Sequence, residues 1–197
     1  MAIVINGSGT VTGLAVGGLP DGTVDDGTVA SGIASSKLTG ALPAISGASL
    51  TGFTDAQMPA GSVIQVVAAS YASATATTSS SLADTGVTAT ITPSATTSKI
   101  LVIVGINGNT TTATNNYMRL LLLRGTSSLI NIETQTGFTS STAKMAVSGS
   151  SSTYLDSPST TSATTYKVQF SNPSATGTVY ICDGGGTATI TLMEIAG

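Results

Sequence analysis

The chain has 197 residues, of which 41% are hydrophobic and only 8% are charged, and its formal net charge is −3. Its six Lys and Arg residues form no basic stripe that could neutralise phosphates, which argues against nucleic acid and acidic lipid surfaces as partners. The single cysteine, Cys182, excludes intrachain disulfides and a thiolate metal site built from one chain, and we expect it to be a small buried side chain.

Residues 1–60 are rich in Gly, Thr, Ser and Ala, and isolated aliphatic residues recur along them. Short units repeat, at 21–24 and 26–29 and again at 38–40 and 50–52. The aliphatic residues are too sparse to enclose a core within one chain, so they need an identical neighbour. We therefore predict an intertwined trimeric β shaft of short strands and Gly-rich turns. Its expected axial core is Leu14, Leu19, Val24, Val29, Ile33, Leu38, Leu42, Ile45 and Leu50.

The sequence carries no recognisable leader or membrane anchor. Residues 1–6 include neither a basic segment nor an apolar stretch as long as that of a signal peptide, and no later segment reaches the length of a membrane span. We expect a protein that is synthesised in the cytoplasm and does not insert into a membrane.

Residues 61–197 predict an all-β domain with a jelly-roll-like antiparallel β-sandwich fold. In residues 166–170 apolar and polar side chains alternate, so Tyr166, Val168 and Phe170 are expected to face the core. Turn residues and alternation together predict strands at about 63–67, 86–92, 99–106, 117–124, 142–148, 165–171, 177–182 and 187–195.

Two of these predicted strands, at 100–104 and 120–123, are apolar on both faces. Their second face must be covered by something other than the opposite sheet. We predict a subunit interface at Leu101, Ile103, Leu121 and Leu123. The alternative is that a loop or the first strand of the same subunit covers this face.

The residues offer little catalytic chemistry. The chain has no histidine, which excludes Ser-His-Asp and Cys-His nucleophile arrangements. Its acidic residues show neither a convincing glycosidase pair nor calcium-loop spacing, so no catalytic, cofactor-binding or metal-ligating residues are predicted.

Some polar and aromatic residues could instead contact a receptor. Tyr117, Arg119 and Tyr154 are candidates because tyrosines can stack on sugars, although core packing of the tyrosines is an alternative. Loops predicted at 109–116, 134–141 and 156–164 are rich in Ser, Thr and Asn, which suits adaptable polar contact.

Several segments resemble the tail-fibre proteins of tailed bacteriophages, especially those of phages that infect marine bacteria and cyanobacteria. The segments that carry the resemblance are 18–25, 38–52, 61–67, 91–94, 98–102 and 191–196. The resemblance implies a homotrimer in which residues 1–60 form a virion-attachment segment and shaft, and residues 61–197 form a C-terminal head at the tip. It implies partners in other tail or baseplate proteins and in a host surface glycan or outer-membrane component.

The expected function is therefore that of a structural virion protein that contacts the host-cell surface. A capsid decoration, cement or head-fibre protein is the first alternative, and a polysaccharide-degrading tailspike is the second. The expected location is the virion, after synthesis in the host cytoplasm.

Overall fold

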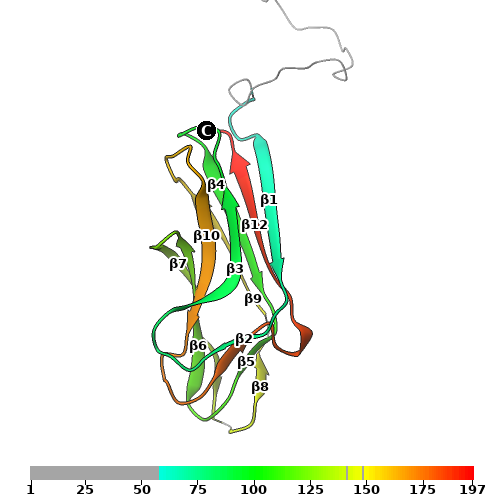
Figure 1. Ribbon diagram of the computed structural model, residues 1–197, viewed down its shortest axis with the longest axis vertical. Helices are drawn as coiled ribbons and strands as arrows, with labels where there is room; N and C mark the ends of the chain where they lie inside the picture. Colours follow the sequence, from blue (N-terminus) through cyan, green and yellow to red (C-terminus); the bar gives the residue numbers. More distant parts are fainter. Residues whose placement is uncertain (1–57, 141, 148) are drawn as a thin grey trace, which may run out of the picture. The chain divides into compact units, whose positions relative to one another are not determined.

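The computed structural model describes residues 58–197, apart from residues 141 and 148 (Figure 1). In this part of the chain all strand pairs are antiparallel, and the one helical element is a 3-10 turn, η4 (Asp183–Gly185). The all-β prediction is confirmed for these residues. The predicted shaft core, Leu14 to Leu50, lies outside them, so the shaft and the division of the chain at residue 60 stay predictions.

Eight strands of seven residues or more form two four-stranded sheets. The first sheet has the order β1 (Val63–Tyr71), β12 (Ala188–Ile195), β4 (Lys99–Ile106) and β9 (Ser150–Asp156). The second sheet has the order β3 (Ala83–Ile91), β10 (Thr164–Ser171), β6 (Asn116–Arg124) and β7 (Ser127–Thr139). This strand order is consistent with a jelly-roll sandwich.

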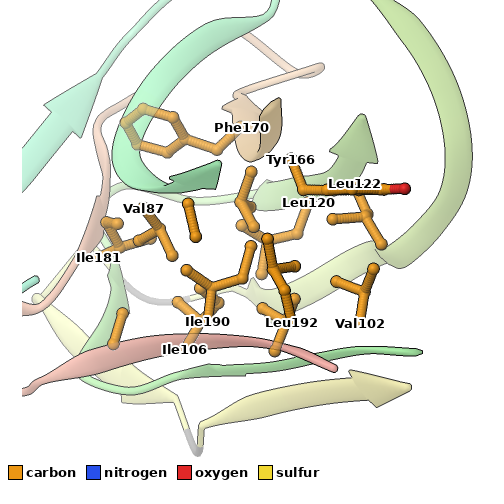
Figure 2. Close-up of a cluster of buried hydrophobic side chains, with 14 of the residues drawn as sticks. Val87, Val102, Ile106, Leu120, Leu122, Tyr166, Phe170, Ile181, Ile190 and Leu192 are labelled. Carbon is orange, nitrogen blue, oxygen red and sulfur yellow. The ribbon is translucent and has the colours of Figure 1, made fainter. Parts of the chain in front are cut away.

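The core lies between the two sheets (Figure 2). Tyr166 and Phe170 of the second sheet face Ile190 and Leu192 of the first, and all four side chains are fully buried. Val168 of β10 is also fully buried, so the alternation predicted for that strand is confirmed. Each such aliphatic or aromatic side chain contributes about 1.5–3 kcal/mol on burial, and the core therefore dominates the stability of the sandwich.

A third, small sheet continues the first one. Its strands follow the order β2 (Thr75–Thr77), β11 (Val179–Ile181), β5 (Asn109–Thr111) and β8 (Met145–Val147). Each adjoins, along the chain, the strand at the same position of the first sheet. The strands of the first sheet are therefore interrupted at one level, and the chain continues them in the short third sheet, at the lower end of Figure 1.

Where the strands of the first sheet are interrupted, the backbone of residues 107–108 lies close to that of residues 182–186. The N–H of Cys182 donates to the carbonyl of Asn107 at 2.9 Å, and the N–H of Asp183 donates to that of Gly108 at 3.0 Å. A Cβ atom at Gly186 would lie 2.7 Å from the Cα of Gly108, a distance that only glycine permits.

Eight observed strands overlap the eight predicted ones, with the bounds of β4 as predicted. Four strands were not predicted: β2, β5, β7 and β9. Residues 134–139, expected in a loop, form the end of β7.

Candidate functional site

The sandwich has two distinct ends. Gly61 donates to the carbonyl of Ala196 at 2.8 Å, and Ala196 donates to that of Ser62 at 2.9 Å. The chain therefore enters the sandwich beside its own C-terminus, at an end that we call the proximal pole. The opposite end, the distal pole, holds the third sheet and its loops (Figure 1).

Of the predicted loops, 109–116 lies at the distal pole, where its first three residues form β5. Residues 156–164 connect the proximal ends of β9 and β10, and they lie at the proximal pole instead. The structure thus separates segments that the sequence had grouped together as recognition loops.

The outer face of the first sheet, which points away from the core, carries no charge in the three rows described next, and its apolar side chains lie toward the proximal pole. One cross-strand row runs over all four strands as Val66, Met193, Leu101 and Leu155. Val66 is 53% exposed and Leu155 is 50% exposed. The next row toward the distal pole is Ala68, Thr191, Ile103 and Thr153, and the following one is Ser70, Thr189, Gly105 and Ser151.

This face includes two of the residues predicted to form a subunit interface. Leu101 is partly exposed and Ile103 is 39% exposed on the central strand β4. No described residue of the chain covers them fully. The apolar second face that the sequence indicated for residues 100–104 is therefore not covered by the residues that the structure describes.

The outer face of the second sheet differs. Leu121 and Leu123 are 3% and 4% exposed within one chain. Leu121 pairs with Gln169 and Asn131, and Leu123 pairs with Lys167 and Ser128.

Polar side chains on this face bind one another. The Lys167 ammonium lies 2.8 Å from the Asp84 carboxylate, which also accepts a hydrogen bond of 2.8 Å from Gln169. The hydrogen bond from Lys167 makes the largest contribution to holding the pKa of Asp84 below its usual value, and the hydrogen bond from Gln169 makes the next.

Because the two leucines are already buried within one chain, the exposure that led us to predict an interface at Leu121 and Leu123 is absent. Within one chain, Leu121 and Leu123 are shielded from solvent between residues of β10 and β7.

The three candidate receptor contacts do not form one site. Tyr117 and Arg119 share the outer face of β6, where Arg119 donates to Asn131 at 3.0 Å. The ring of Tyr117 lies 6.4 Å from that of Phe138, which is 60% exposed. Tyr154 instead packs against the core from β9. Core packing, the alternative, therefore holds for Tyr154.

A groove of about 460 Å³ at the distal pole, lined by both polar and apolar residues, was not foreseen from the sequence. The Lys144 ammonium lies 2.5 Å from the Asp183 carboxylate and 4.4 Å from the centre of the Tyr180 ring. The Thr110 hydroxyl donates to the same carboxylate at 2.8 Å. The hydrogen bonds from Lys144 and Thr110 hold the pKa of Asp183 below its usual value, and the bond from Lys144 contributes more. No pattern in the sequence connects residues 110, 144 and 183.

A buried carboxylate organises the proximal pole. Glu194 of β12 accepts hydrogen bonds from the Ser94 N–H at 2.7 Å, from the Ser94 hydroxyl at 2.5 Å and from Gln65 Nε2 at 2.5 Å. Burial raises the pKa of Glu194, but the hydrogen bonds from Ser94, Gln65 and Ser98 outweigh it and hold that pKa below its usual value. Glu194 thus fixes the loop between β3 and β4 to the first sheet, a structural role.

Among residues 58–197 without 141 and 148, no three His, Cys, Asp or Glu side chains lie close enough together to hold a metal ion. No helix in this part of the chain is long and apolar enough to cross a membrane. No protein-family model matches the sequence, and no curated protein matches it.

Proposed function

We propose that the protein is the subunit of a homotrimeric bacteriophage tail or baseplate fibre, a structural and non-enzymatic virion protein. Its N-terminal segment would attach to other tail or baseplate proteins. Its sandwich would be the head that contacts a glycan or an outer-membrane component of the host surface. A location on the virion follows from this function.

The observation that carries the proposal is that the two ends of the sandwich differ. The N–H of Gly61 donates a hydrogen bond to the carbonyl of Ala196, so both the incoming chain and the C-terminus are at the proximal pole. The distal pole is therefore free to point outward. It presents loops rich in Ser, Thr, Asn and Gly, together with the Lys144 and Asp183 groove and the exposed Phe138.

Such a surface suits adhesion by many weak contacts. The two charged groups of the groove, Lys144 and Asp183, are already paired with each other, so a single copy would hold a ligand weakly. Three copies on one fibre raise the effective affinity without new contacts, because the second and third binding events are intramolecular.

The first test is the mass of the purified full-length chain by light scattering coupled to size exclusion. We expect three times the 19.3 kDa mass of the subunit. A stable monomer would refute the fibre.

The second test locates the protein on particles by immunogold labelling with an antibody raised against it. Gold at the tail supports the proposal, whereas gold on the capsid supports a decoration, cement or head-fibre protein. Release of reducing sugars from host capsule or lipopolysaccharide would support a tailspike.

A further inference from the structure

We infer that the outer face of the first sheet is covered by other copies of this chain. The inference deepens the proposed function, on which its trimeric form depends, because it names the surface through which the heads meet. The occupant is argued below from the composition, the size and the shape of this face.

The composition of this face favours a like partner. Within the described residues, the three cross-strand rows of this face contain no charged side chain. The charged residue of β4, Lys99, lies at the proximal end of that strand. Identical faces can therefore meet without bringing like charges together. The outer face of the second sheet carries Asp84, Lys167 and Arg119, so one chain builds one charged face and one neutral face.

The plan area of the face is somewhat smaller than the area that each partner buries in a standard interface. Four strands about 4.8 Å apart and eight residues long at about 3.3 Å each give a face of about 500 Å² in plan. The side chains add relief to the plan area, which brings the face toward the roughly 800 Å² per partner of a stable interface.

The shape of the face also fits an extended protein surface. Its side chains become smaller from the row with Met193 and Leu101 to the row with Ser70 and Gly105. This gradient leaves the distal part of the sheet smooth, and the protruding apolar side chains gather toward the proximal pole. A small ligand would need a concave pocket, whereas another sheet can lie flat on this face.

Thiol labelling of the full-length chain tests the inference. Ile103→Cys places a thiol on the face, and Leu82→Cys is the matched control, since Ile103 is 39% and Leu82 is 36% exposed in the single chain. The native Cys182 is buried, so it contributes little background. We expect a maleimide to label position 103 roughly tenfold more slowly than position 82 in the native assembly, because packed side chains exclude the reagent.

Oxidation of methionines in the unmodified chain gives a second measurement, in case either variant assembles poorly. Met193 lies on the face, Met145 is 43% exposed elsewhere and Met118 is buried in the core. We expect Met193 to resist peroxide as Met118 does, while Met145 forms the sulfoxide readily.

The mass measured on the same samples separates the outcomes. A trimer in which Ile103→Cys is labelled slowly supports both proposals. A trimer with rapid labelling at 103 and rapid oxidation of Met193 overturns this inference and leaves the fibre intact. A dimer with slow labelling keeps the face as an interface between copies but refutes the trimer. A monomer with slow labelling overturns both proposals, since residues 1–57 of the same chain would then cover the face.

Discussion

The hydroxyl of Tyr166 on β10 donates a hydrogen bond of 2.7 Å to the carboxylate of Asp156 on β9, which joins an inner strand of the second sheet to an edge strand of the first. Arg124 Nη1 lies 2.7 Å from the same carboxylate oxygen. Burial raises the pKa of Tyr166, and the hydrogen bond to Asp156 raises it further. The tyrosine hydroxyl therefore remains a neutral donor. A side chain that packs in the core thus also bonds one sheet of the sandwich to the other.

Tyr166→Phe should destabilise the sandwich while keeping its core packed. The substitution removes one donor from Asp156, which is 6% exposed, and we expect a loss of about 1–3 kcal/mol in the free energy of unfolding. Urea denaturation at fixed protein concentration measures it, as a lower midpoint with an unchanged slope. Tyr117→Phe is the control, because that tyrosine lies on an outer face, and an equal loss in both variants would contradict the assigned role.

Glu194→Gln should destabilise the protein at neutral pH. An amide in place of the carboxylate accepts fewer hydrogen bonds and turns an N–H toward the donors of Ser94 and Gln65. We expect a cost of about 1–3 kcal/mol in the free energy of unfolding. Glu133→Gln removes the same charge from a half-buried position on β7 and controls for net charge.

The stability that Glu194 contributes should also depend on pH. Because its folded pKa is lowered, the contribution is fully present above the usual value of 4.5 and is lost as the pH falls through the folded pKa. The gap between wild type and Glu194→Gln in denaturation midpoints should therefore narrow from pH 6 to pH 3. Asp84 and Asp183 also have lowered pKa values, so they reduce the stability of both proteins alike as the pH falls. A difference between the two denaturation midpoints that stayed constant with pH would argue against an ionised Glu194.

Gly86→Ala should cost more than Gly125→Ala. Both glycines have positive φ, of 89° and 56°, so either alanine carries strain of about 1–2 kcal/mol. A Cβ at Gly86 would in addition clash with Cε2 of the Tyr71 ring, whereas no atom lies within 4 Å of one at Gly125. Thermal melts of the two variants should show the larger drop for Gly86→Ala, and similar drops would mean that the Tyr71 ring moves aside freely.

Cys182 should not react in the native protein. It is 1% exposed, its Sγ lies 3.4 Å from the carbonyl oxygen of Tyr71, and burial raises the pKa of its thiol. Since the thiolate is the reactive form, iodoacetamide should modify Cys182 only once urea unfolds the chain. Mass spectrometry after brief exposure at increasing urea concentrations tests this, and prompt alkylation in buffer would show that the region around β11 opens.

The alternation in β10 was sufficient to predict its buried side, because Tyr166, Val168 and Phe170 occupy every second position. The sequence also indicated a buried Cys182, which the structure confirms. The four missed strands lack such a signal. β2 and β5 have three residues each, β9 begins with three serines, and β7 pairs with β6 through repeated register shifts that break a strict period of two.

The sequence by itself determined that residues 61–197 fold as antiparallel β structure and that the second faces of β4 and β6 are apolar, since these properties depend only on composition and local period. Only the tertiary structure decided that Leu121 and Leu123 are buried within the chain while the described residues leave Ile103 39% exposed. It also brought Glu194 to Ser94 and Lys144 to Asp183. The physical reason is that cover and pairing depend on cross-strand register between distant segments, and a local period does not contain that information.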